Sequence, residues 1–131
     1  MRNGFVRIAA AVPEVRVADT NYNLTQILSS MEKAAHSKAD ILLLPYLCIT
    51  GATCGDLFFQ NTLLSGAEEG LSTILAATRN LDMVTVVGMP VQDELSGALY
   101  NCAVLLHKGS VLGVVPKTHL TRAQRRYFSP N

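Results

Sequence analysis

Two stretches of the chain carry apolar residues at three- and four-residue spacing, the repeat that gathers side chains on one face of a helix. The first begins near Asn21, with Asp19 or Asn21 available as its N-cap, and its apolar positions are Leu24, Ile27, Leu28, Met31, Ala34 and Ala35. The second covers roughly residues 60–79, and its repeating positions are Leu63, Leu64, Ala67, Leu71, Ile74, Leu75 and Thr78. The pattern predicts two amphipathic helices.

Shorter apolar runs have the length and composition of strands, and they cover residues 5–12, 40–45, 83–91, 98–107 and 111–115. The first run ends at Pro13, and the second empties into a glycine-containing loop at 50–55. Turns around Gly97 and Gly109 separate the last three runs. The predicted order is strand, helix, strand, helix, strand, strand, strand, which is an α/β protein that begins with βαβ units and continues as hairpins.

The predicted strands are apolar on both faces, and the first one in particular suits a strand buried on both sides. Two helices cover only one side of such a sheet. A partner or further chain would then have to bury the other side. The alternative is a small, complete sandwich whose second face is less polar than usual.

Composition places the chain among globular proteins, because 49% of its 131 residues are hydrophobic and 16% are charged. This length suits one domain or part of one. The net charge of +1 gives no field that attracts nucleic acid, and Arg122, Arg125 and Arg126 are interpreted as a solvated surface. No apolar run approaches the roughly 20 residues of a membrane span. Neither nucleic acid nor a membrane is an expected partner.

The cysteines and histidines do not form a recognisable ligand set. Cys48, Cys54 and Cys102 are an odd number without CxxC pairing, which favours a reducing, cytoplasmic setting. His36 is expected at a helix end and His107 in a strand, and neither has metal-ligand spacing. No glycine-rich phosphate loop follows a strand. The sequence therefore predicts neither a metal nor a cofactor.

Five blocks of sequence follow one another along almost the whole chain: GFVRIAAAVPEVRVAD, LLLPYLCITGATCGDLFF, VVGMPV, LYNCAVLLHKG and VLGVVPK. In order and spacing they resemble the glutaminase domain of glutamine-dependent NAD⁺ synthetase, in the carbon–nitrogen hydrolase (nitrilase) superfamily. The resemblance implies the N-terminal half of a four-layer α-β-β-α sandwich, so that residues 1–131 would form a single, incomplete domain. It also implies a small amide such as glutamine as substrate, whose ammonia a separate synthetase domain, not seen in this sequence, would use.

Members of this family use a cysteine nucleophile, a glutamate as general base and acid, and a lysine that stabilises the oxyanion. The resemblance assigns the lysine role to Lys117, which directly follows Pro116. It places Tyr46 where the family has the glutamate, because the family's Pro-Glu-Leu reads Pro45-Tyr46-Leu47 here. A phenol with an ordinary pKa near 10 is a poor replacement for a carboxylate base.

Further departures concern the nucleophile and the substrate pocket. The family's nucleophile would lie beyond Asn131, and neither Cys48 nor Cys54 has a motif partner that would lower its pKa. The family's Gly-Tyr, which shapes the glutamine pocket, corresponds to Gly51 and Ala52. After Lys117, a family loop with a second carboxylate is shortened, and His119 is the remaining weak candidate for the pocket.

Three hypotheses follow from these features. The first is a truncated, catalytically inactive glutaminase half-domain. The second is a non-catalytic binding or assembly module that uses the uncovered sheet face, as a homo-oligomer or with an intact relative. The third is one half of a split amidase, in which another chain supplies the cysteine.

Overall fold

The computed structural model describes residues 4–130, and its elements follow the predicted order. The helices and strands are β1 (Ile8–Ala10), α1 (Thr20–His36), β2 (Ile41–Leu43), α2 (Asn61–Ala77), β3 (Val84–Gln92), β4 (Leu99–His107) and β5 (Ser110–Pro116), with short 3₁₀ turns η1 (Gly55–Phe59) and η2 (Gln124–Arg126). Asn131 lies outside the described residues. The α/β class and the βαβαβββ order are confirmed.

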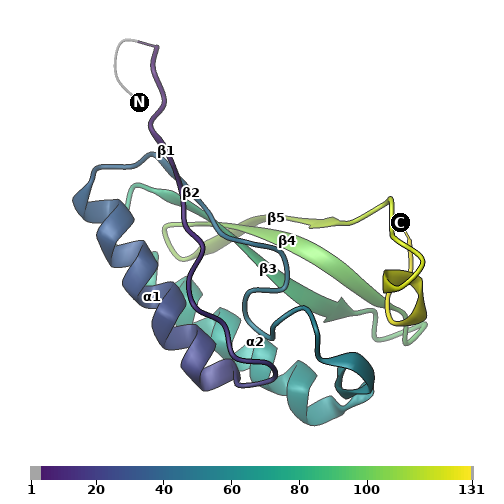
Figure 1. Ribbon diagram of the computed structural model, residues 1–131. Helices are drawn as coiled ribbons and strands as arrows, with labels where there is room; N and C mark the ends of the chain where they lie inside the picture. The colour runs from purple at the N-terminus through teal and green to yellow at the C-terminus, as the bar shows by residue number, and fades with distance from the viewer. Residues whose placement is uncertain (1–3, 131) are drawn as a thin grey trace.

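One mixed sheet contains all five strands in the order β1-β2-β3-β4-β5. β1, β2 and β3 run parallel, while β4 is antiparallel to both of its neighbours. Each parallel pair is joined through a helix, and Figure 1 shows α1 and α2 on the same side of the sheet. We call the second side, which neither α-helix of residues 4–130 covers, the helix-free face.

The start of α1 is fixed by two side chains. Asp19 is the N-cap, because its Oδ1 accepts a hydrogen bond from the Tyr22 amide at 3.0 Å. Asn23 is fully buried. Its Oδ1 accepts a hydrogen bond from the Arg16 amide, and its Nδ2 donates to the carbonyls of Arg16 and Ile49. These bonds attach the loop before α1 and the loop after β2 to the helix.

The expected first strand over residues 5–12 is too long, and the expectation that it is buried on both faces is wrong. β1 has three residues, pairs only with β2 and has the pattern exposed, half-buried, exposed. β1 is an edge strand, so β2 is its only neighbour for hydrogen bonds, and β2 itself has only three residues. Val12 beyond the end of β1 is 89% exposed. Apolar composition alone did not reveal that this run lies at the sheet edge.

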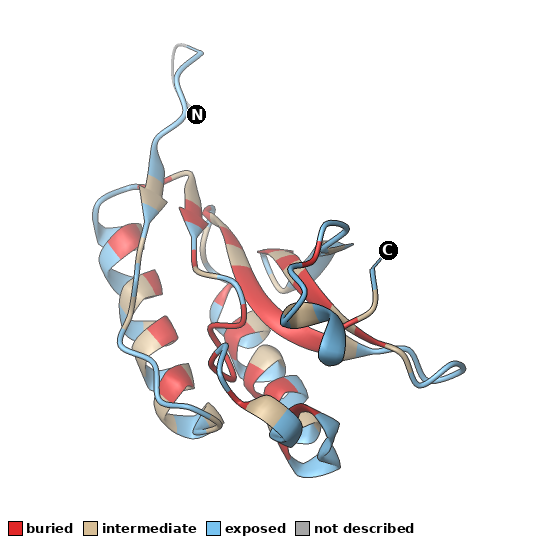
Figure 2. Ribbon diagram, turned by 45° about the vertical axis from the view of Figure 1, so that its right-hand side comes forward, coloured by how far each residue is buried: buried red, intermediate tan, exposed pale blue. Residues whose placement is uncertain are grey.

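The core consists of two hydrophobic clusters, and Figure 2 shows the buried segments in red. The larger lies between the helices and the sheet and includes Ile27, Met31, Leu42, Ile74, Val87, Val104 and Leu106. The smaller contains Leu47, Cys54, Phe58, Leu63, Leu99, Leu120 and Phe128. Side chains alternate along a strand, so Leu99 points away from the face that holds Cys102, Val104 and Leu106. The smaller cluster therefore covers one end of the helix-free face.

No helix in the described part of the chain is both long enough and apolar enough to cross a membrane.

Candidate functional site

Tyr46 and Lys117 lie at the same edge of the sheet. β2 is parallel to β3, and β5 also runs in the direction of β3 because β4 reverses between them. Tyr46 follows the end of β2, and Lys117 directly follows the end of β5. The Lys117 ammonium lies 5.7 Å from the centre of the Tyr46 ring. The fold thus brings together two residues that are far apart in sequence.

Gly88 allows the Tyr46 segment to lie directly on β3. A Cβ atom on Gly88 would meet the Tyr46 Cα at 2.6 Å and the Pro45 carbonyl oxygen at 2.7 Å, and it would approach the Leu47 amide nitrogen even more closely. The Gly88 carbonyl also accepts a hydrogen bond from the Ile49 amide at 3.4 Å. All of these neighbours are backbone, so only glycine fits at this crossing.

Lys117 is held by its backbone and by one side chain. Its amide donates to the Asn101 carbonyl at 2.8 Å, which extends the pairing of β4 with β5 by one residue. Its ammonium donates to Gln124 Oε1 at 3.2 Å, and that same oxygen accepts from the Thr121 amide at 3.0 Å. Gln124 therefore orients the exposed ammonium towards the site edge.

The pair carries a cation but no carboxylate. The Tyr46 side chain is 59% exposed, and its hydroxyl makes no hydrogen bond with residues 4–130. The ammonium and the ring have the separation of a cation–π contact. In the ion pairs Lys108–Asp82 and Arg126–Asp56 the carboxylate pairs with a cation other than Lys117. The arrangement can stabilise negative charge on a bound oxygen, but it offers no proton acceptor of ordinary carboxylate strength.

Asn101 is a site residue that the sequence analysis did not single out. It is 3% exposed, and its Nδ2 lacks a hydrogen-bond partner among the described residues. Its register partner is Pro90, two residues from Gly88 on the same strand face, and its carbonyl holds Lys117. The sequence feature that could have identified Asn101 is its position as a polar residue inside the apolar strand LYNCAVLLH. Asn101 is therefore linked to the site through its backbone bond to Lys117.

The three cysteines are free and buried, and their surroundings do not activate them. Burial raises the pKa of Cys48 to about 11, and burial likewise raises the pKa of Cys102 to about 11. Burial also raises the pKa of Cys54, whose Sγ donates to the Thr50 carbonyl at 3.1 Å. A nucleophilic cysteine needs the opposite shift, towards the thiolate. These thiols pack as small apolar side chains.

The two remaining candidates, Ala52 and His119, are both exposed. No hydrogen bond or ring contact within residues 4–130 joins either of them to Tyr46 or Lys117. His36 ends α1 and His107 ends β4, as expected. No group of three or more His, Cys, Asp or Glu side chains in the described segment could hold a metal ion.

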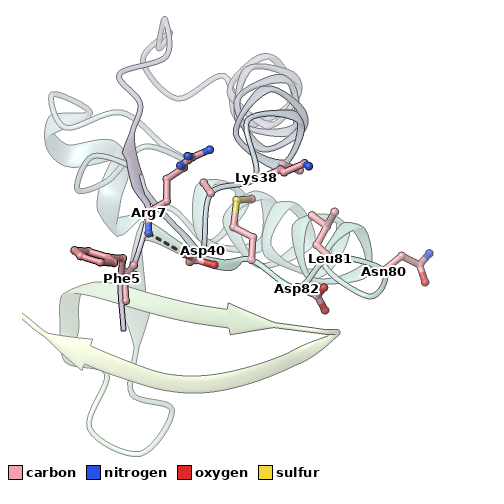
Figure 3. A pocket seen from close by; sticks show the side chains of 11 residues that line it. Phe5, Arg7, Lys38, Asp40, Asn80, Leu81 and Asp82 are labelled. Atoms are coloured by element: carbon pink, nitrogen blue, oxygen red, sulfur yellow. Dashed lines mark hydrogen bonds between the residues drawn. The ribbon is translucent and has the colours of Figure 1, made fainter. Parts of the chain in front are cut away.

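A hollow of about 650 Å³ lies at the opposite edge of the sheet, near the starts of β1, β2 and β3 (Figure 3). Three of its polar residues, Arg7, Asp40 and Asp82, form bonds within the protein. The Arg7 amide donates to Asp40 Oδ2 at 2.8 Å, and the Arg7 guanidinium donates to the Ser37 carbonyl at 2.9 Å. Asp82 pairs with Lys108 at 3.0 Å. The hollow is thus separate from the Tyr46–Lys117 edge.

Comparison with known proteins matches the fold and its order to one family. Residues 7–131 match the profile of the carbon-nitrogen hydrolase family. A glutamine-dependent NAD(+) synthetase from Mycobacterium tuberculosis is 34% identical over 127 residues, which are 96% of this chain and 18% of that protein. The corresponding protein from Aquifex aeolicus is 32% identical over 86% of this chain and 20% of its own length. The chain spans about a fifth of the length of these curated relatives.

Solved structures of similar proteins have the same fold as this chain. A glutamine-dependent NAD(+) synthetase from Cytophaga hutchinsonii superposes with a TM-score of 0.88 at 32% identity, over 95% of this chain and 22% of that one. An amidase from Nesterenkonia sp. has a TM-score of 0.83 at 22% identity, over 100% of this chain and 50% of that one, and shows the fold alone. The five-stranded sheet with its two helices is therefore the N-terminal part of a nitrilase-type fold, and the chain belongs to the carbon-nitrogen hydrolase family.

Proposed function

We propose that this chain has the scaffold of a glutamine-hydrolysing domain of the NAD⁺ synthetase kind and lacks its amide-hydrolysing activity. The observation that carries the proposal is Tyr46, which stands where the family resemblance calls for a carboxylate, beside the Lys117 ammonium. The relatives named as glutamine-dependent NAD(+) synthetases support the scaffold. Tyr46 supports the loss of activity.

Amide hydrolysis by a thiol requires a group that takes the proton from the nucleophile and returns it to the leaving ammonia. A neutral phenol has an ordinary pKa near 10 and cannot serve as that acceptor at pH 7. Lys117 retains the ability to attract a carbonyl oxygen. The chain can therefore bind a small amide such as glutamine at this edge without turning it over.

The test measures ammonia released from glutamine by the purified chain, with the Mycobacterium tuberculosis NAD(+) synthetase as the active reference. We expect no release above background from the unmodified chain or from the Tyr46→Phe variant. We also expect none from Tyr46→Glu, because the buried thiols of the described region stay protonated. Release by the unmodified chain in proportion to its concentration would refute the proposal. Release by Tyr46→Glu alone would show that a nucleophile is available after all.

A second candidate function, assembly without catalysis, is favoured by the exposed apolar side chains on the helix-free face of the sheet. The split-amidase alternative predicts ammonia release when the chain is mixed with a cysteine-containing C-terminal half. We expect no release in that mixture, since Tyr46 remains. The free thiols suit a reducing compartment such as the cytoplasm.

A further inference from the structure

The Tyr46–Lys117 edge combines a cation with neutral groups. A lysine side chain carries a positive charge at pH 7, whereas a phenol and an amide are neutral. The structure gives the Lys117 ammonium two partners, the Tyr46 ring at 5.7 Å and Gln124 Oε1 at 3.2 Å. Neither of them carries a negative charge, so these partners leave the positive charge of the ammonium unbalanced.

The backbone at residue 46 is held in place beside this cation. Its neighbour Leu47 is 2% exposed and has a φ of 52°, in the left-handed region that leucine rarely adopts. Residues 45–47 also cross β3 at Gly88, where a Cβ atom would overlap their backbone. A strained, buried residue on a crossing segment persists only when its surroundings fix it. A charge introduced or removed at residue 46 therefore acts at a defined place near Lys117.

The same edge presents hydrogen-bond donors. A lysine ammonium has several N–H groups and no acceptor. Cys102 pairs with Pro116, so Asn101 is opposite Lys117, and the Lys117 amide donates to the Asn101 carbonyl at 2.8 Å. Opposite residues of two strands point to the same face of the sheet. Asn101 Nδ2, a donor without a partner among the described residues, therefore lies on the same face as the Lys117 side chain.

A carboxylate and an amide of equal size interact differently with such an edge. A carboxylate only accepts hydrogen bonds and carries the charge that attracts an ammonium, whereas an amide is neutral and has N–H donors of its own. A carboxylate at residue 46 would repel an anionic ligand and would accept from the N–H groups of an amide. The neutral Tyr46 does not repel the anion. Charge and donors at this edge therefore favour the carboxylate.

We infer that the Tyr46–Lys117 edge binds small carboxylates in preference to the matching amides, and that Tyr46 determines this specificity. The inference rests on the proposed function, in which this edge is a ligand site that does not hydrolyse amides. It names the ligand class, an organic anion with a small apolar tail that contacts the exposed Tyr46 ring. Hydrogen bonds from an ammonium to a carboxylate are about twice as strong as neutral ones. Lys117 is therefore the anchor of the ligand.

Propionate and propionamide are the probes, because they are equal in size and differ in charge and in hydrogen-bond donors. Backbone amide chemical shifts of the isotopically labelled full chain report binding at constant ionic strength. Each probe is titrated to about 100 mM, well above the dissociation constant on the order of 10 mM expected for so small a ligand. We expect propionate to bind at least about threefold more tightly, with the largest shifts near Lys117.

Substitutions at the edge separate charge from shape. Lys117→Gln should abolish the preference for propionate, because it removes the cation. Tyr46→Glu should also abolish it, because a carboxylate beside Lys117 repels the anion. Tyr46→Gln is the matched control, since glutamine has the shape of glutamate without its charge, and it should keep the preference.

Lys33→Gln controls for a general attraction of anions to the chain. Lys33 is exposed in the last turn of α1, on the helix-covered side of the sheet. This variant should leave the affinities for both probes unchanged. Amide shifts away from the edge check that every variant is folded.

Propionamide binding as tightly as propionate would overturn the inference, and so would the absence of shifts near Lys117 with either probe. A preference that Tyr46→Glu leaves unchanged, or that Tyr46→Gln removes, would overturn it as well. Ammonia released from propionamide or glutamine is measured in the same samples and would count against the proposed function instead. The two failures are therefore distinguishable.

Discussion

Gly88 is the residue on which the position of Tyr46 depends. We expect Gly88→Ala to lower the free energy of unfolding by about 1–3 kcal/mol, because its Cβ would overlap backbone atoms that no rotamer change can move. Urea denaturation followed by circular dichroism measures the loss. Gly113→Ala is the matched control, since a Cβ there has nothing within 4 Å. Equal stabilities of the two variants would contradict this account of the crossing.

Other features of the site could be read from the sequence only in part. Lys117 and Tyr46 were found through the family's motifs, and the structure places them at one edge. Gly88 and Asn101 lie inside the sequence blocks that carry the family resemblance. The polar residue in an apolar strand singles out Asn101, but the sequence does not show that it is buried or that Gly88 underlies a crossing chain. Close backbone approach and burial depend on tertiary contacts, which no single-residue pattern encodes. Sequence therefore identified the chemistry of the edge, while its support became visible only in three dimensions.

At the scale of elements, periodicity predicted long segments better than short ones. The helices of seventeen residues each, and the two nine-residue strands, lie close to their expected bounds. The three-residue strands β1 and β2 are shorter than their apolar runs. A helix is defined by its own repeat, whereas the length of an edge strand depends on its neighbour's hydrogen bonds. That dependence also explains why the first run was wrongly expected to be buried on both faces.

The attachment of α1 to its flanking loops gives a prediction for this element. Asn23→Ala should lower the free energy of unfolding by about 2–4 kcal/mol, because it leaves the Arg16 amide and the buried Ile49 carbonyl without the partner they have in the fold. Thermal or urea unfolding measures the change. Asn80→Ala, at an exposed position, is the control and should stay within about 0.5 kcal/mol. A loss as small as that of the control would show that water replaces the Asn23 bonds without cost.

At the scale of the whole molecule, the two faces of the sheet have different roles. The helix-covered face contains the larger cluster and provides most of the burial. The other face has the smaller cluster at one end and the Tyr46–Lys117 pair at its edge. One face therefore provides most of the core, while the other borders the candidate site.

The thiols within these clusters make the stability of the whole chain depend on alkaline pH. Folding raises the pKa of Cys48 and Cys102 from 9.0 to about 11, so between these values the unfolded chain loses protons that the folded chain keeps. The thiol contribution is complete below about pH 9 and is lost as pH rises towards 11. Each thiol should reduce the free energy of unfolding by up to about 1.4 kcal/mol per pH unit there. Urea unfolding at pH 8, 9, 10 and 11 measures this slope, and Cys48→Ala should make it shallower. A slope that Cys48→Ala leaves unchanged would mean that other groups govern the alkaline unfolding.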